Sequence, residues 1–272
     1  MAEATARRPS RATKAEHVGM GMYEAVVART RRLTPHLVRV TLASEELRGF
    51  RDDGPDQRFK LLLPHPGQER PVLPDREDWY ESWRAMPVDV RPVMRTYTIR
   101  TARPEEGEVD VDVVLHQPSG PASSWAAAAA PGDRVALYAA WAEYEVAPDA
   151  GRQLVAGDHT ALPAIGAICE RLDAGAQADV LVEVAGPEER LELCTPPGVV
   201  LRWLDAVPGR PGAALAAAVG ALPVDIGFGY AWVAADRDTV AQIRRHLVGA
   251  RGLAPEQVMF MGYWRTDGAI DE

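Results

Sequence analysis

Residues 95–100 read Arg95-Thr96-Tyr97-Thr98-Ile99-Arg100, and this stretch is the strongest indication of the fold and of a bound ligand. Its β-branched and aromatic residues are typical of a strand. Side chains alternate along a strand, so we expect two faces: Arg95, Tyr97 and Ile99 on one, and Thr96, Thr98 and Arg100 on the other. A guanidinium offers a rigid fork of donors to phosphate oxygens, and a phenol ring offers a stacking plane. The stretch therefore suits a ligand that joins an anionic group to a flat heteroaromatic ring, although an ordinary barrel strand with surface arginines has the same pattern.

The segment that follows predicts a second strand and then a helix. Residues 109–116 alternate between apolar and polar side chains, which predicts a half-buried strand ending in His116. The next residues pass through Gly120-Pro121-Ala122-Ser123-Ser124 into an alanine-rich helix, with Ser119 or Gly120 as its cap. Small side chains before a helix N-terminus let a phosphate approach the backbone amides. The alternative is a capped helix that only closes a barrel.

The remaining strands of the first half predict a small antiparallel barrel. Strand patterns cover residues 23–30, 37–42, 59–63 and 134–138, and turn signals separate them. A proline-rich insertion at 64–91 interrupts this pattern, and a helix from Asp75 to Met86 is expected inside it, capped by Asp75. Its tryptophans either pin the loop to the barrel, which we favour, or form a lid over a bulky ligand.

The second half of the chain predicts an open α/β domain with a mainly parallel sheet. Strand patterns at 152–156, 179–184, 199–204, 230–234 and 257–262 alternate with helical ones. Residues 157–161 follow the first of these strands, at the end of the sheet where ligands bind. No GxGxxG motif occurs. We expect a disordered arm over 1–21, a barrel domain over 22–147 and an α/β domain over 148–272.

Composition excludes several classes of function. The chain has 272 residues, 47% of them hydrophobic and 25% charged, with a net charge of −9. Such a balance is typical of a soluble globular protein and disfavours binding to nucleic acid or to an anionic membrane. Its two cysteines, Cys169 and Cys194, lie in apolar contexts and are expected to be reduced core thiols. No cluster of cysteines and histidines indicates a metal site, and no apolar run is long enough to span a membrane.

These motifs together resemble the siderophore-interacting proteins, the cytoplasmic FAD-dependent ferric-siderophore reductases of the ferredoxin-reductase-like flavoproteins. The resemblance rests on Arg95-x-Tyr97-Thr98, His116 with Gly120-Pro121-Ala122-Ser123 and Trp125-Ala126, Gly157-Asp158-x-Thr160-Ala161-Leu162-Pro163-Ala164, and Gly262-Tyr263-Trp264-Arg265. It implies an FAD-binding barrel followed by a domain for NADPH or NADH. The residues that it implies as cofactor-binding are Arg95, Tyr97, Thr98, Arg100, Asp112, Val114, His116, Gly120, Ala122, Ser123, Ser124, Asp158, Thr160, Ala161 and Trp264.

Three positions depart from the family pattern. His159 stands where many members carry Glu, and Ala235-Asp236 stands where the family often has Gly-Glu. One additional residue, Asp267, precedes the final Gly268 of the C-terminal motif. For Asp158, a helix cap is at least as plausible as a contact with the nucleotide.

The resemblance implies an enzyme that reduces Fe(III) held by a siderophore, a hydroxamate or a catecholate, and so releases iron in the cytoplasm. We expect a monomer that needs neither a catalytic side chain nor a metal site of its own, because the cofactors carry the chemistry. A basic pocket for the siderophore could draw on Lys60, Arg84, Arg91 and Arg265, although solvated surface charge is the simpler interpretation. Two alternatives stay open: a general NAD(P)H:flavin or ferric reductase, and a non-enzymatic ferric-siderophore binding protein. A protein that binds no flavin would support a third, structural role.

Overall fold

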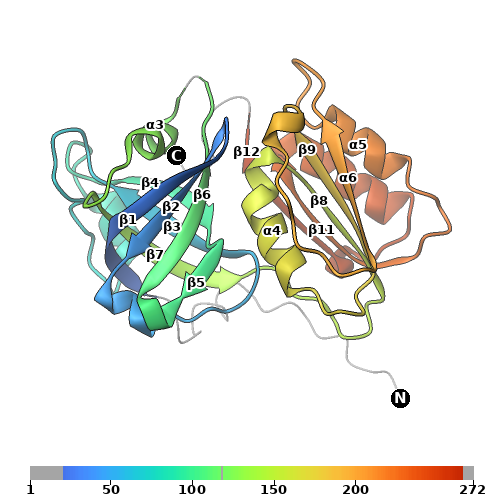
Figure 1. Cartoon of the computed structure of the whole chain (residues 1–272), viewed down its shortest axis with the longest axis horizontal. Helices are drawn as coiled ribbons and strands as arrows, with labels where there is room; N and C mark the ends of the chain where they lie inside the picture. The colour runs from blue at the N-terminus through green and yellow to red at the C-terminus, as the bar shows by residue number, and fades with distance from the viewer. Residues whose placement is uncertain (1–20, 118, 266–272) are drawn as a thin grey trace.

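The computed structural model describes residues 21–117 and 119–265, and these form two lobes that face each other (Figure 1). The first lobe is a seven-stranded antiparallel sheet and the second a five-stranded parallel sheet with helices on both faces. The predicted fold class is therefore confirmed. The connection between the last strand of one sheet and the first strand of the other runs from residue 143 to residue 151. The expected boundary at 147–148 falls there and stays a prediction.

The first sheet curls into a barrel that is not closed. Its strands follow the spatial order β4-β3-β7-β1-β2-β6-β5, and the backbone N–H of Arg100, just after β4, donates to the carbonyl of Asp110 in β6 at 2.9 Å. This contact brings the two ends of the sheet together. The strands are β1 (Met22–Thr34), β2 (Leu37–Ala43), β3 (Gln57–Leu63), β4 (Val93–Thr98), β5 (Thr101–Arg103), β6 (Glu108–Val114) and β7 (Arg134–Ala142).

Three of the predicted elements in this lobe end or begin elsewhere than expected, and one of them, the strand predicted to end in His116, ends at Val114. The strand predicted over 95–100 ends at Thr98, because Ile99 and Arg100 turn the chain toward β6. The helix predicted from Asp75 to Met86 is α2 (Trp79–Ala85), and Asp78 occupies its N-cap position. The carboxylate of Asp75 instead accepts from the N–H of Glu77 and forms a local turn.

The insertion lies against the outside of the barrel. The ring of Trp79 stacks on Tyr138 in β7 with centroids 4.2 Å apart, and the indole of Trp83 donates to the carbonyl of Pro92 at 2.9 Å. Both tryptophans pack on an apolar cluster formed by Met22, Leu62, Met94 and Ala136. The tryptophans therefore pin the insertion to the barrel, as the favoured interpretation expected.

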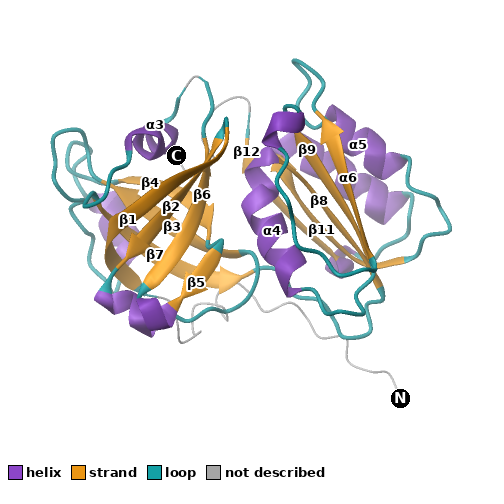
Figure 2. Cartoon of the chain, viewed as in Figure 1, coloured by secondary structure: helices purple, strands orange, loops and turns teal. Residues whose placement is uncertain are grey.

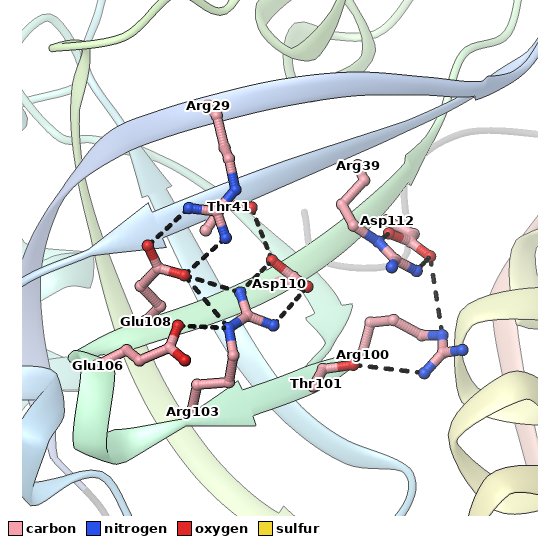
Figure 3. A network of polar contacts seen from close by, with 10 residues as sticks. All are labelled: Arg29, Arg39, Thr41, Arg100, Thr101, Arg103, Glu106, Glu108, Asp110 and Asp112. Atoms are coloured by element: carbon pink, nitrogen blue, oxygen red, sulfur yellow. Dashed lines mark hydrogen bonds and ion pairs between the residues drawn. The ribbon is translucent and has the colours of Figure 1, made fainter.

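Strand β6 is buried on both faces, so the prediction of a half-buried strand was wrong. Val109, Val111 and Val113 belong to the barrel core, whereas Asp110 and Asp112 lie under side chains from neighbouring strands. Asp112 accepts two hydrogen bonds from Arg39 at 2.7 and 2.8 Å, and Asp110 accepts from Arg103 at 2.8 Å and from the hydroxyl of Thr41 at 2.7 Å (Figure 3). Ion pairing across strands thus buries a face that its own sequence marks as polar.

The second sheet follows the order β10-β9-β8-β11-β12. Its strands are β8 (Arg152–Asp158), β9 (Ala178–Val184), β10 (Val199–Asp205), β11 (Phe228–Asp236) and β12 (Val258–Trp264). Helix α4 (Leu162–Arg171) covers the face toward the barrel, and α5 (Ala213–Gly220) and α6 (Arg237–Gly249) cover the other face (Figure 2). Short 3-10 turns η1 (Glu45–Gly49), η2 (Pro104–Glu106), η3 (His159–Ala161), η4 (Pro187–Glu189) and η5 (Pro255–Gln257) and the barrel helix α3 (Pro121–Ala128) complete the fold.

The two cysteines lie in different environments. Cys169 is a buried residue of α4, whereas Cys194 is exposed in the loop between η4 and β10, so the prediction of two core thiols was wrong for Cys194. An irregular loop can carry apolar residues without burying them, and a local sequence window does not reveal this. Within the described ranges, no helix combines the length and the apolar character needed to cross a membrane.

Candidate functional site

The turn before α3 has the geometry expected of a phosphate site. Gly120 occupies the N-cap position in an extended conformation, Pro121 begins the helix, and no side chain caps it. The first amides of a helix lack partners within the helix, so they remain available to an anion. Ala122 and Ser123 are buried and small. The turn therefore fits the pyrophosphate of a dinucleotide cofactor.

His116 is tied to this turn from both sides. Its backbone N–H donates to the hydroxyl of Ser123 at 3.1 Å, and its carbonyl accepts from the hydroxyl of Ser119 at 3.1 Å. The exposed imidazole lies beside Gly120, where an added Cβ would be 3.5 Å from the ring. Ser124, also exposed, continues the helix through a bond from its N–H to the carbonyl of Gly120 at 2.9 Å. The structure thus brings together the predicted residues from 116 to 124.

Strand β4 presents Tyr97 to the barrel interior and Thr98 to the other lobe. The Tyr97 ring packs against Phe59 with centroids 6.5 Å apart, and burial raises the pKa of its phenol, which therefore stays protonated. Thr98 is buried, and its hydroxyl is hydrogen-bonded to the hydroxyl of Tyr263 in β12. One N–H of the Arg95 guanidinium donates to the carbonyl of Met94 at 2.8 Å, and its side chain stays half-buried.

Arg100 and Asp112 belong to a network of charges rather than to an open binding surface. The Arg100 guanidinium makes two hydrogen bonds to Glu170 of α4, one of them 2.7 Å long. Its Nε lies 3.9 Å from Asp112 (Figure 3). Only 10% of the Arg100 side chain is exposed. Because carboxylates surround it, we leave Arg100 out of the proposed phosphate-binding set, and we assign Asp112 to the same network. Val114, paired with Leu37, packs on the core beneath α4.

The turn after β8 gathers three of the predicted nucleotide residues. Asp158 is buried, and its Oδ1 accepts from the N–H of Thr160 at 2.9 Å and from the Thr160 hydroxyl at 2.5 Å. Its Oδ2 accepts from the indole of Trp264 at 2.7 Å. Burial raises the pKa of Asp158, although these hydrogen bonds oppose the shift. Asp158 is thus the cap of η3, and Ala161 is fully buried behind it.

Sequence reasoning missed Glu189, which connects the lobes. This carboxylate is fully buried and accepts from three groups in the turn between β1 and β2: the Thr34 hydroxyl, the His36 N–H at 3.3 Å and the His36 Nδ1 at 2.6 Å. Its Oε2 also lies 3.5 Å from Nε2 of His159. Burial acts to raise the pKa of Glu189, but the hydrogen bonds from Thr34 and His36 outweigh it and lower the pKa. The Pro187-Glu188-Glu189 sequence carries no signal beyond that of a surface turn.

The proposed contributors to a basic pocket have partners elsewhere. The Nζ of Lys60 donates to the Thr96 hydroxyl at 2.6 Å, and the Arg91 guanidinium lies 4.6 Å from the centroid of the Trp83 ring. Lys60 and Arg91 thus have contacts within the protein, and a basic pocket for the siderophore stays a prediction. We find no cluster of three or more potential metal ligands among the described residues.

Comparison with known proteins identifies both lobes. Residues 26–142 match the family model of the siderophore-interacting FAD-binding domain, and residues 150–267 match that of the siderophore-interacting protein. The ferric vibriobactin reductase ViuB of Vibrio cholerae is 30% identical over 239 residues, which are 87% of each chain. The siderophore-interacting protein SipS of Aeromonas hydrophila is 32% identical with a TM-score of 0.79, over 93% of this chain and 95% of its own.

The fold extends to more distant flavoproteins. The ferredoxin reductase of carbazole 1,9a-dioxygenase superposes with a TM-score of 0.63 at 17% identity, over 90% of this chain and 70% of its own. At this identity the likeness concerns the fold alone, and it makes the fold ferredoxin-reductase-like. The two family models match the two lobes in the same order, and ViuB is matched along most of its length. The chain therefore belongs to the siderophore-interacting protein family.

Proposed function

We propose that this protein is an FAD-dependent oxidoreductase that uses NADPH or NADH to reduce ferric siderophores and so releases iron as Fe(II). One observation carries the proposal: the strand predicted to bind the flavin and the strand end predicted to bind the nucleotide are bridged by consecutive residues of one strand, β12. Thr98 at the end of β4 bonds to Tyr263, and the next residue, Trp264, bonds to Asp158 at 2.7 Å. A transfer between two cofactors needs such closeness.

The barrel, assigned to residues 22–147, would hold the FAD. When bound, FAD accepts a hydride from the nucleotide and passes electrons singly to an acceptor. Tyr97 offers an aromatic plane whose phenol stays neutral because burial raises its pKa. Gly120, Ala122, Ser123 and Ser124 offer small side chains and the amides of an uncapped helix to the pyrophosphate. Arg95, Val114 and His116 complete the proposed set.

The α/β domain, assigned to residues 148–272, would hold the nicotinamide nucleotide. The carboxylate of Asp158 orients Thr160 and Trp264, so its role is to shape the turn. Thr160 and Trp264 would then line the nucleotide at the carboxyl end of the parallel sheet, with the buried Ala161 packed beneath them. His159 is held neutral at physiological pH, because burial lowers its pKa. No side chain at this turn is required as a general acid or base.

The iron enters with the substrate. Hard oxygen donors such as hydroxamates and catecholates hold Fe(III) far more tightly than Fe(II), so reduction loosens the complex. The similarity to ViuB, whose name refers to ferric vibriobactin, supports a siderophore as the substrate. A monomer acting in the cytoplasm, where the released Fe(II) would be used, completes the proposal.

The test begins with the absorption spectrum of the purified protein after addition of FAD and removal of unbound flavin. NADPH or NADH is then added without oxygen, followed by a ferric hydroxamate or a ferric catecholate together with a chromogenic Fe(II) chelator. We expect the flavin band to bleach with nucleotide and to return as the Fe(II) complex appears. A flavin band that persists with both nucleotides, in protein that still binds the ferric siderophore, would favour the binding-protein alternative. Bleaching without any Fe(II) would favour a general flavin reductase, and failure to bind FAD would refute the proposal.

A further inference from the structure

A single buried carboxylate connects the barrel to the last two strands of the second lobe. Asp56 precedes β3 and has no exposed surface. It accepts from the indole Nε1 of Trp232 in β11 at 2.8 Å and from the hydroxyl of Tyr263 in β12 at 2.8 Å. Both donors come from the other lobe, and their rings meet edge to face with centroids 6.5 Å apart.

The backbone at Asp56 is held in an uncommon conformation. Its φ of +57° is the only positive value for a non-glycine residue in the described part of the chain. Asp tolerates this left-handed region better than most residues, yet such a conformation persists only where its surroundings require it. Here it turns the carboxylate out of the barrel and into the interface. Backbone strain of this kind points to a constrained role for the side chain.

Asp56 also lies between the two proposed cofactor sites. The hydroxyl of Tyr263 that donates to Asp56 is itself bonded to Thr98, the last residue of the proposed flavin strand. The residue after Tyr263 is Trp264, which holds Asp158 in the proposed nucleotide turn. A shift of Tyr263 would therefore be felt at both sites.

We propose that Asp56 is a positioning residue, whose carboxylate fixes Tyr263 and Trp232 and thereby sets the nucleotide turn at its working distance from the flavin strand. This inference rests on the proposed function, because it gives Asp56 a role in the transfer between the two proposed cofactors. Asp56 touches neither cofactor in the proposal and acts through Tyr263.

The same geometry makes the contact sensitive to pH. An ionised carboxylate accepts both hydrogen bonds, whereas a protonated one carries a donor of its own and competes with Trp232 and Tyr263, which also donate. Burial raises the pKa of Asp56 to about 6, with the hydrogen bond from Trp232 and the charge of Arg58 opposing the shift. The other charged group that faces it is Glu143, which accepts from Arg58 at 3.0 Å. Transfer between the cofactors should therefore slow as the pH falls through about 6.

The experiment compares Asp56→Asn with Asp52→Asn in the FAD-loaded protein. Asp52 lies in the same loop and forms an ion pair with Arg171 of the other lobe, so it controls for the general loss of a contact between lobes. Flavin reduction by NADPH and by NADH is followed by stopped flow from pH 5 to pH 8, and near-ultraviolet circular dichroism records the aromatic environment over the same range. Tyr263→Phe serves as a second variant that removes one donor and keeps the ring.

We expect the Asp56→Asn protein to reduce its flavin roughly ten- to a hundredfold more slowly at pH 7.5, because small misplacements of reacting groups have effects of this size. It should also lose the wild-type decline in rate and the dichroism change near pH 6, and Tyr263→Phe should share the slower rate. Equal rates and equal dichroism profiles in the Asp56→Asn and Asp52→Asn proteins would overturn the inference. A wild-type protein that no nucleotide reduces would instead overturn the proposed function, and the dichroism profiles would still decide the role of Asp56.

Discussion

The substitution Gly157→Ala tests how tightly the proposed nucleotide turn is packed against the sheet. Gly157 is the penultimate residue of β8. A Cβ at this position would lie 2.7 Å from the carbonyl oxygen of Ala234 in β11, 2.7 Å from Cβ of Ala161 and 3.0 Å from Cδ1 of Ile165. Gly157 has no positive φ, so the effect is steric. The Ala234 carbonyl belongs to the central part of the sheet and cannot move without its strand.

The size of the effect follows from these contacts. Forcing an additional methyl group into a well-packed interior costs about 1–3 kcal/mol of folding free energy. For a chain of this length each kcal/mol lowers the melting temperature by about 2–4 °C, so we expect a decrease of roughly 2–12 °C. The relief of the clash would also displace Asp158 and Thr160, and the affinity for the nicotinamide nucleotide should fall with it.

Two other glycines provide matched controls in the same domain. At Gly166 a Cβ would lie 3.1–3.3 Å from the guanidinium of Arg100, the end of a long side chain, and at Gly175 nothing lies within 4 Å. Thermal unfolding followed by far-ultraviolet circular dichroism should rank Gly157→Ala as the least stable and Gly175→Ala as close to wild type. Gly166→Ala should fall between them, because alanine favours the helix by up to about 1 kcal/mol while Arg100 must shift. Equal melting temperatures for Gly157→Ala and Gly175→Ala would refute the reasoning.

Three further predictions concern other parts of the chain. In the native protein, a thiol reagent should label Cys194 quickly and leave Cys169 unlabelled until unfolding, because burial raises the pKa of Cys169 to about 12. Rapid labelling of both thiols would contradict the buried position of Cys169. Hydrogen bonds lower the pKa of Glu189, so its contribution to stability is complete above its ordinary pKa of 4.5 and is lost as the pH falls through the lower folded value. Glu189→Gln should therefore lose less stability than wild type between pH 5 and pH 3 in urea unfolding, and an unchanged pH dependence would count against this account. Ser123→Ala leaves the N–H of His116 without its acceptor. The dissociation constant of FAD, measured by flavin-fluorescence titration, should therefore rise by up to about tenfold, the effect of one hydrogen bond. An unchanged dissociation constant would mean that this hydrogen bond does not contribute to FAD binding.

Local pattern predicted the elements of the fold, because alternation and capping depend on residues close in sequence. The burial of the polar face of β6 could not be predicted this way, because the arginines that cover Asp110 and Asp112 come from β2 and β5. The registry of strands that are distant in sequence decides such contacts. The exposed position of Cys194 was not visible in its apolar neighbourhood, because an irregular loop can carry apolar residues without burying them.

The candidate site was predictable only in part, since one chemical group suits several partners. A guanidinium binds phosphate and carboxylate with the same fork of donors, so the sequence alone could not tell that Arg100 faces Glu170. A threonine hydroxyl can likewise face a ligand or a tyrosine, and Thr98 bonds to Tyr263. The turn at Gly120 was easier to predict, because its small residues and proline act on the local backbone. Asp56 and Glu189 were missed because acids in turns indicate solvent exposure far more often than burial.

The contacts between the lobes also explain how one arrangement of the two domains is selected. Consecutive residues of α4 carry opposite charges, and each meets its complement on the barrel: Glu170 pairs with Arg100, and Arg171 pairs with Asp52. A screw movement of the helix by one residue, a rise of about 1.5 Å with a rotation of about 100°, would set like charges against each other, so these two pairs help to specify how the lobes dock. The buried carboxylates act differently, because Asp56 and Glu189 leave water entirely and must keep their donors. Removing one of those donors would leave a buried charge incompletely satisfied, whereas Arg171 and Asp52 are partly exposed and water can solvate them when their pair is broken. The interface therefore combines charge pairs from consecutive residues of α4 with two buried carboxylates held by hydrogen bonds, and one of these carboxylates, Asp56, lies between the two proposed cofactor sites.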